Sequence, residues 1–177
     1  MEPTQNEHPY ARLTPDLILR ALESAGFVCD GRLLALNSYE NRVYQIGIEE
    51  QPPLIAKFYR PERWNDPQIL EEHAFSYELA AQELPVVTPL KNTDGESLHA
   101  YQGFRFALFP RRGGHPPELD NFDNLLVLGR TLGRIHEVGK AAAFEARQQI
   151  TVERMLSESR AFLLDGFIPE PLVPAYG

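Results

Sequence analysis

Apolar residues recur along the chain at two spacings, and the change from one to the other predicts the order of helices and strands. Between Thr14 and Gly26 they fall three and four positions apart, typical of an amphipathic helix with Thr14 as N-cap and Pro15 as first residue. Further along, short apolar runs with period-two character indicate strands. The expected strands cover residues 32–36, 43–48, 54–59 and 103–109, and the further helices cover residues 67–82, 121–138 and 152–164.

Turn-forming residues set the limits of these elements. Residues 49–53 are expected to form a turn that ends in two prolines. Asp66 is expected to cap the helix that begins at Pro67. Residues 92–95, Asn-Thr-Asp-Gly, predict a hairpin turn between short strands. The proline-rich residues that follow 164 are expected to lack regular structure.

This order of elements predicts an α+β fold. Three antiparallel strands, one inserted helix and two more strands, all preceded by a helix, are typical of the small lobe of a protein kinase. The helices that follow would begin a large lobe. The expected divisions are a flexible N-terminus at 1–13, the small lobe at 14–110, a hinge or linker at 111–120 and an incomplete helical lobe at 121–177. The first helix of that lobe is expected to bury Leu125, Leu126, Leu128, Leu132 and Ile135.

Composition narrows the classes of function. Hydrophobic residues at 43% and charged residues at 24% are ordinary for a globular protein. A net charge of −8 argues against nucleic acid, for which only the pairs Arg60 with Arg63 and Arg111 with Arg112 offer a basic patch. The lone Cys29 cannot form an internal disulfide. Because the start does not resemble a signal peptide and no apolar run approaches ~18 residues, we expect a cytoplasmic protein without a membrane partner.

Lys57 is the first candidate for chemistry. Period-two alternation places it on one face of its strand with Ile55 and Tyr59. A lysine between two such residues either extends to solvent at an exposed edge or points inward to a charge partner. Taken alone, the exposed position is the more common of the two.

Glu72 changes that balance. At about 100° per residue it lies close to the stripe formed by Ile69, Phe75 and Leu79, which should face the sheet. A glutamate in an apolar stripe is costly unless it is paired, and Lys57 on the preceding strand is the natural partner. A lysine on a strand with a glutamate on the next helix is the pair that holds nucleotide phosphates in kinase-type ATP sites.

Other kinase signals are weaker or missing. The loop at 37–41 contains no glycine, so Ser38 and Asn41 would have to supply donors to phosphate, and an ordinary polar turn is the simpler interpretation. Phe109 ends its strand where an adenine would meet a hinge. His136 is interpreted as structural. No catalytic loop of the form His-x-Asp is found, and residues 165–167, Asp-Gly-Phe, are interpreted as a turn.

Three segments resemble a known family. Residues 36–44, Leu-Asn-Ser-Tyr-Glu-Asn-Arg-Val-Tyr, are similar to the first hairpin of the bacterial stress response kinase A family. Residues 57–64, Lys-Phe-Tyr-Arg-Pro-Glu-Arg-Trp, and residues 68–73, Gln-Ile-Leu-Glu-Glu-His, resemble the same family. The similarity is near-continuous over residues 33–140. This family belongs to the aminoglycoside phosphotransferase and choline kinase-like branch of the kinase fold.

The resemblance implies the N-terminal portion of a cytoplasmic serine/threonine protein kinase that uses ATP and Mg²⁺ in stress response and acts as a monomer on a protein or peptide. By that likeness Ser38 contacts the nucleotide, Lys57 holds its phosphates and Glu72 pairs with Lys57. The family's catalytic aspartate, the asparagine after it and its second metal-binding aspartate would lie beyond Gly177. We therefore expect no catalytic residue and no Mg²⁺ ligand within these residues, and no turnover by the chain alone.

Two alternatives stay open on the residues. A kinase of the same branch could phosphorylate a small molecule such as an amino alcohol, a sugar or an aminoglycoside, because the acceptor is read mainly by the large lobe. A non-catalytic nucleotide-binding module would bind ATP without turnover.

Overall fold

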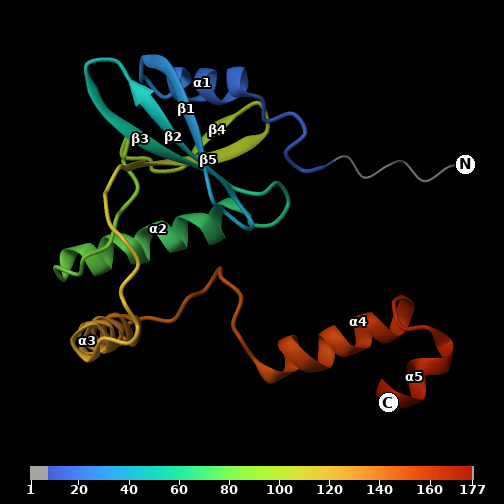
Figure 1. Ribbon diagram of the computed structural model, residues 1–177. Coiled ribbons are helices and arrows are strands. Elements are labelled where there is room, and N and C mark those ends of the chain that lie inside the picture. Colours follow the sequence, from blue (N-terminus) through green and yellow to red (C-terminus); the bar gives the residue numbers. More distant parts are fainter. Residues whose placement is uncertain (1–7, 177) are drawn as a thin grey trace, which may run out of the picture. The chain divides into compact units, whose positions relative to one another are not determined.

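A five-stranded antiparallel sheet with the order β1-β2-β3-β5-β4 dominates the computed structural model (Figure 1), which describes residues 8–176. Contacts between residues divide the chain into two compact units, Met1–Ala143 and Phe144–Gly177. The first unit contains the sheet, and the α+β class expected from the sequence is confirmed. Its strands are β1 (Cys29–Leu36), β2 (Arg42–Ile48), β3 (Gln51–Phe58), β4 (His99–Tyr101) and β5 (Phe104–Pro110).

The turn expected over residues 49–53 is shorter than predicted. Only Glu49 and Glu50 form it, and β3 already begins at Gln51. The register between β2 and β3 shifts just before this turn, between Ile46 and Ile48. Prolines are tolerated at the first residues of a strand and beside bulges, where a missing N–H breaks no regular ladder.

The hairpin was predicted at the wrong place. Residues 92–95 do form a turn, closed by a 3.0 Å hydrogen bond from Gly95 N to Asn92 O, but no strand flanks it. The hairpin between β4 and β5 turns instead at Gln102 and Gly103, with φ of 45° and 87°. Two successive left-handed residues are what a tight hairpin turn requires, and glycine adopts that conformation without strain.

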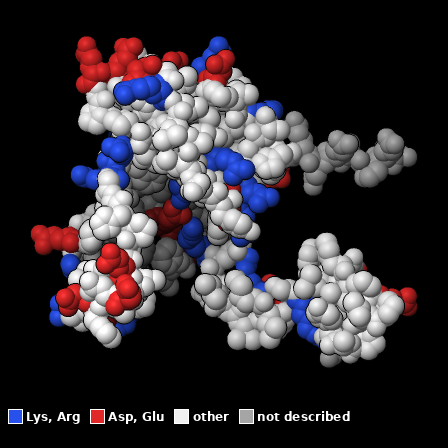
Figure 2. Space-filling view, in the orientation of Figure 1, with Lys and Arg blue, Asp and Glu red and all other residues white. Residues whose placement is uncertain are grey.

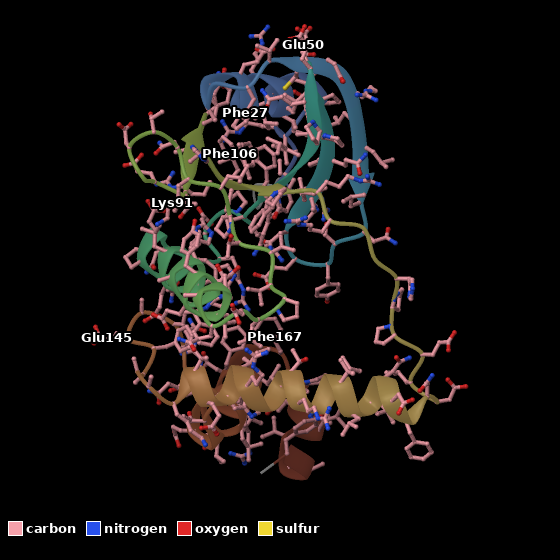
Figure 3. All side chains as sticks on the ribbon, turned by 90° about the vertical axis from the view of Figure 1, so that its left-hand side faces the viewer. Phe27, Glu50, Lys91, Phe106, Glu145 and Phe167 are labelled. Carbon is pink, nitrogen blue, oxygen red and sulfur yellow. The ribbon has the colours of Figure 1, made fainter. Side chains whose placement is uncertain are left out.

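The main core lies between one face of the sheet and α1 (Pro15–Ser24). Alternate residues of β3 and β5 supply it, including Phe58 and Phe106, both fully buried (Figure 3). Tyr10 and Leu13 also belong to this core. They depart from the flexible terminus expected at 1–13, because their side chains are buried, while residues 1–7 lie outside the described residues.

The opposite face of the sheet packs against α2 (Asp66–Ala81), which carries Glu72. The predicted cap of this helix is wrong by one residue. The side chain of Asn65 accepts a hydrogen bond from Gln68 N at 3.0 Å, while the side chain of Gln68 accepts one from Asn65 N at 3.1 Å. This reciprocal capping box makes Asn65 the cap, and Asp66 the first helical residue.

The next helix, α3 (Phe122–Gly139), crosses α2, and Arg134 Nη2 donates to Gln82 O at 2.6 Å. The buried side predicted for α3 is only partly formed: Leu128 and Ile135 are half-buried, and the other three predicted residues are exposed. Leu125, Leu126 and Leu132 are between 42% and 54% exposed, and no residue of the helix is fully buried. Helical periodicity identifies the apolar side of a helix, but burial requires a partner surface, and α2 covers only part of α3.

The second unit is helical throughout most of its length. A π-helical turn (Glu153–Glu158) runs into α4 (Ser159–Gly166), which is followed by a 3₁₀ turn (Glu170–Leu172) and α5 (Val173–Tyr176). Residues 165–166 end α4, and the helical turns after 169 correct the irregular structure expected there. A 2.7 Å hydrogen bond from Arg160 Nε to Tyr176 O ties α5 back to α4. Within residues 8–176, no helix is long and apolar enough to cross a bilayer.

Candidate functional site

Lys57 lies near the middle of the sheet on the face that α2 covers. It pairs with Val43 of β2 on one side and with Ala107 of β5 on the other. Leu54, Ala56 and Phe58 point to the main core, so the alternation of β3 directs Lys57 to the opposite face. The small side chain of Ala107 leaves room beside the lysine on that face.

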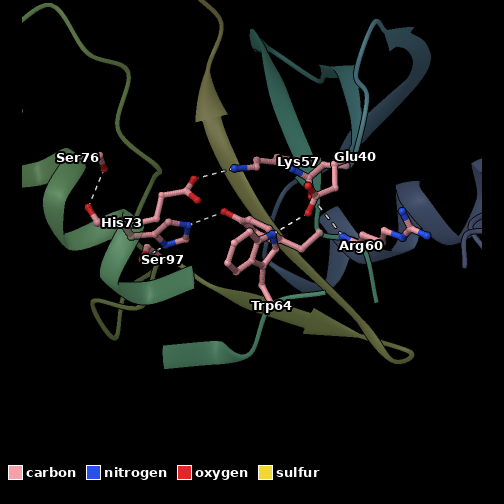
Figure 4. Close-up of polar contacts among 10 residues, drawn as sticks. Glu40, Lys57, Arg60, Trp64, His73, Ser76 and Ser97 are labelled. Atoms are coloured by element: carbon pink, nitrogen blue, oxygen red, sulfur yellow. Dashed lines mark hydrogen bonds and ion pairs between the residues drawn. The ribbon is translucent and has the colours of Figure 1, made fainter. Parts of the chain in front are cut away.

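Lys57 and Glu72 form an ion pair. The distance between Lys57 Nζ and Glu72 Oε1 is 2.7 Å, and the two side chains are 21% and 37% exposed (Figure 4). Lys57 Nζ also lies 4.6 Å from the centre of the Tyr59 ring, a favourable position for a cation. The partial exposure keeps the contribution of this pair to stability to about 1 kcal/mol or less. Its main effect is to fix the position of the ammonium group.

A buried polar network lies next to this pair. The Tyr59 hydroxyl is 2.7 Å from His73 Nε2, and His73 Nδ1 is 2.8 Å from Ser97 Oγ. His73 is 2% exposed, and this burial, with a smaller contribution from the Lys57 charge, lowers the pKa of His73 to about 4. The neutral imidazole therefore ties β3, α2 and the segment before β4 together. No pattern in the sequence predicted this role, although His73 directly follows Glu72.

The loop between β1 and β2 contains Ser38 and Asn41. Ser38 Oγ donates to Leu36 O at 3.5 Å, and Asn41 Oδ1 accepts a hydrogen bond from Arg60 N at 3.3 Å. The oxygen of Asn41 is therefore directed to the β3–α2 loop. Residues 37–41 are all described, and none has a positive φ. This backbone needs no glycine, which explains how the loop can lack one.

The sequence of this chain matches a family of known proteins. The sequence profile of the phosphotransferase enzyme family matches residues 32–165. The chain belongs to this family. The stress response kinase A of Shigella flexneri is 44% identical over 168 residues, which are 94% of this chain and 51% of that protein. The serine/threonine protein kinase RdoA of Salmonella typhimurium is 43% identical over 160 residues, 90% of this chain and 48% of that protein.

The resemblance to stress response kinase A is thus confirmed, and the chain spans about half the length of the curated relatives it matches. Among solved structures, the amicoumacin kinase hAmiN in complex with AMP-PNP, Ca²⁺ and Ami has a TM-score of 0.68 at 20% identity, covering 96% of this chain and 52% of that one. A microcompartment-associated aminopropanol kinase has a TM-score of 0.66 at 20% identity, covering 86% and 54%. These two structures share the fold of this chain.

In this member of the phosphotransferase enzyme family, Phe109 lies on the same face of the sheet as Lys57. It pairs with Ile55 across β3 and β5, two positions from the pair of Lys57 with Ala107. Phe109 is half-buried and packs against the cluster formed by Tyr59, Ile69 and Ala107. An apolar wall of this kind, next to a fixed ammonium group, suits a ligand with one flat apolar end and one anionic end.

A second ion pair joins Arg105 to Asp66, with 2.7 Å between Nε and Oδ1, and its side chains are 41% and 46% exposed. On the face shown in Figure 2, basic side chains are interspersed with acidic ones. Among residues 8–176, no group of three or more His, Cys, Asp or Glu side chains is arranged to hold a metal ion. His136 lies on the exposed surface of α3, as does most of that helix.

Proposed function

We propose that this chain is the nucleotide-binding region of an ATP-dependent serine/threonine protein kinase that acts in the cytoplasm during stress response. The observation that carries the proposal is the 2.7 Å ion pair between Lys57 and Glu72 in a member of a phosphotransferase family. The names of its relatives, stress response kinase A and serine/threonine protein kinase, support the choice of reaction. Phosphoryl transfer itself would be an activity of the complete protein.

The described residues fit a nucleotide. The ammonium group of Lys57 would bind the α- and β-phosphates. The carboxylate of Glu72 and the face of the Tyr59 ring would hold the ammonium group in place. Phe109 and Ile55 would provide the apolar surface for the base. Ser38 would face the phosphates from the β1–β2 loop. Because phosphoryl transfer depends mainly on positioning and on neutralising charge, these residues would act by binding and orientation.

A divalent cation accompanies the nucleotide in the proposal. The fold neighbour hAmiN was solved with AMP-PNP and Ca²⁺, and Mg²⁺ is the usual companion of ATP in such sites. Such a cation would neutralise charge on the phosphates when bound. Among residues 8–176, no group of three or more His, Cys, Asp or Glu side chains is arranged to hold it.

The first test is Lys57→Ala in the complete protein. We expect phosphoryl transfer to fall about 100-fold or more, because the positioned positive charge at the α- and β-phosphates is lost. The fold should be retained, since the ion pair is partly exposed. Near-normal activity of this variant would refute the role of Lys57. Lys91→Ala is the matched control: its ammonium also lies over an aromatic ring, 4.4 Å from the centre of Tyr77, but should not affect activity.

A small-molecule kinase is the second candidate, because the fold neighbours include an amicoumacin kinase and an aminopropanol kinase. Transfer of labelled phosphate from ATP to a peptide library, compared with a panel of amino alcohols, sugars and aminoglycosides, separates the two. Labelling of peptide serine or threonine supports the protein kinase. Labelling confined to the small hydroxyl compounds would favour the alternative. Nucleotide binding by the complete protein without transfer to any acceptor would favour the non-catalytic module.

A further inference from the structure

Glu40, in the loop between β1 and β2, is held from the β3–α2 loop. Its Oε1 accepts a 2.8 Å hydrogen bond from Trp64 Nε1 (Figure 4). The same oxygen accepts a 3.2 Å hydrogen bond from Arg63 Nε. The Glu40 side chain is 30% exposed, so the carboxylate is partly shielded from water. Hydrogen bonds to an ionised carboxylate are stronger than those between neutral groups.

Two further contacts hold the same part of the loop. The Tyr10 hydroxyl donates to Glu40 O at 2.9 Å, and Asn41 Oδ1 accepts from Arg60 N at 3.3 Å. Tyr10 is itself part of the main core, so it anchors the loop from the N-terminal side. Side chains and backbone from two separate segments therefore converge on two adjacent loop residues.

Trp64 and Lys57 contact the same cluster of side chains. Trp64 packs against the cluster of Tyr59, Ile69 and Ala107, and the Lys57 ammonium lies over the ring of Tyr59. The loop and the lysine are thus both positioned by that cluster. A shift of Trp64 would move the loop relative to the lysine.

This arrangement has a physical consequence for binding. A flexible loop must be ordered when it closes over a ligand, and the lost conformational freedom weakens binding. Hydrogen bonds that already hold the loop in the free protein remove part of that cost. A loop without glycine and without left-handed residues is compatible with such a fixed conformation.

We propose that Glu40 is a positioning residue, and that its hydrogen bond from Trp64 latches the β1–β2 loop in the conformation that binds nucleotide. The proposal rests on the proposed function, because it assigns the loop a nucleotide. Glu40 touches no ligand in this role. It acts through the loop, and the loss of the latch should weaken nucleotide affinity while leaving the Lys57–Glu72 pair intact.

The test combines two measurements on the complete protein. Hydrogen exchange of residues 37–41 without nucleotide reports the latch directly, and calorimetric titration with AMP-PNP and Mg²⁺ reports affinity. We expect Glu40→Ala and Trp64→Phe each to speed exchange in the loop about tenfold and to weaken AMP-PNP binding about fivefold. Glu40→Gln keeps an oxygen that can accept from Trp64, and should stay within about twofold of the unchanged protein. Exchange in β3 should not change.

The controls separate the latch from a general loss of charge or stability. Glu49→Ala removes an exposed carboxylate from the β2–β3 turn, at the opposite end of β2, and should change neither measurement. The double variant Glu40→Ala with Trp64→Phe should bind about as weakly as either single variant, because both remove the same contact. In turnover, the KM for ATP should rise several-fold with little change in kcat, which a merely structural defect would not produce.

Each outcome decides between the proposals. Faster loop exchange with weaker AMP-PNP binding supports the latch. Unchanged exchange, or unchanged binding despite faster exchange, would overturn the latch while the nucleotide site stands. If the protein without substitutions does not bind AMP-PNP, the proposed function is wrong. The proposed role of Glu40 in nucleotide binding is then wrong as well, even if hydrogen exchange shows that Glu40 and Trp64 hold the loop. If Glu40→Ala unfolds the protein, Trp64→Phe and Glu40→Gln still give the same comparison.

Discussion

The sheet with α1 and α2 differs from α3 in what happens to its apolar side chains. Phe58 and Phe106 are fully enclosed between the sheet and α1. In α3, Leu126 and Leu132 are exposed by about half. Both regions have the apolar periodicity that favours regular structure, and both form the elements expected.

The apolar periodicity of a segment and the burial of its side chains are therefore separate properties. A strand in the middle of this sheet has hydrogen-bonded neighbours on both sides and a helix against each face. Among the described elements, α3 has its main packing contacts with α2, where the two helices cross. The apolar stripe of α3 therefore contributes to helix formation, but it adds less to the free energy of unfolding than the same residues would in the sheet.

Truncation of a buried core side chain should reduce the free energy of unfolding the most. Phe106→Ala should lower the free energy of unfolding by about 3–5 kcal/mol, because it leaves a cavity at a fully buried position. Leu126→Ala, at an exposed position of α3, should change it by about 0.5 kcal/mol or less. Unfolding by urea, followed through the fluorescence of Trp64, the single tryptophan of the 177 residues, measures both. Equal losses for the two variants would show that the two regions do not differ in packing.

The sequence alone predicted the elements of the fold better than their ends. Gly26 and the apolar spacing before it were sufficient to place α1, and alternation was sufficient to place β2 and β3. The ends depended on three-dimensional features: a bulge let Pro52 enter a strand, and Gly103 formed a hairpin that the Asn-Thr-Asp-Gly motif had suggested elsewhere. The buried side of α3 could not be predicted, because it depends on what packs against the helix.

For the site, the sequence pointed to the two charges, and the structure brings Lys57 and Glu72 within 2.7 Å. Their assignment to nucleotide binding stays a prediction, as does that of Ser38, Asn41 and Phe109. The supporting contacts were not foreseen. Trp64 reaches Glu40 across 24 residues, and His73 reaches Ser97 across 24, and neither separation leaves a periodic signal in the sequence.

Lowering the pH should reduce the free energy of unfolding by an intermediate amount. Burial lowers the pKa of His73 to about 4, so between pH 6.5 and 4 the unfolded chain binds a proton that the folded chain does not. The free energy of unfolding should therefore fall as the pH drops through this window, by up to about 3 kcal/mol at pH 4. Nearby Glu72 opposes the shift, whereas Lys57 and His99 add to it.

His73→Gln isolates this contribution. The variant removes the titrating group, so its unfolding free energy should depend less on pH between 6.5 and 4 than that of the unchanged protein. His99 also has a lowered pKa and would leave part of the slope in place. Urea unfolding at four pH values across the window measures the difference between the two proteins. Parallel curves would show that His73 does not titrate at a depressed pKa.

The smallest effect compares the caps of the two helices. Asn65 caps α2, which packs on the sheet, and Asn121 caps α3 by accepting from Asp123 N at 2.9 Å. Asn65→Ala should lower the global free energy of unfolding by about 1 kcal/mol, since the capping box is lost from a helix that unfolds with the core. Asn121→Ala removes a similar bond from a helix with few buried contacts. Its effect should be local.

Hydrogen exchange distinguishes local from global loss. Asn121→Ala should speed exchange in the first turns of α3 while the urea midpoint stays within error of the unchanged protein. Asn65→Ala should shift the midpoint and speed exchange in α2 and the core strands together. If Asn121→Ala also lowered the global free energy of unfolding by about 1 kcal/mol, α3 would be as strongly coupled to the core as α2 is. The exposure of the leucines in α3 would then not predict the stability of this helix, because the contact between α3 and α2 would couple α3 to the core.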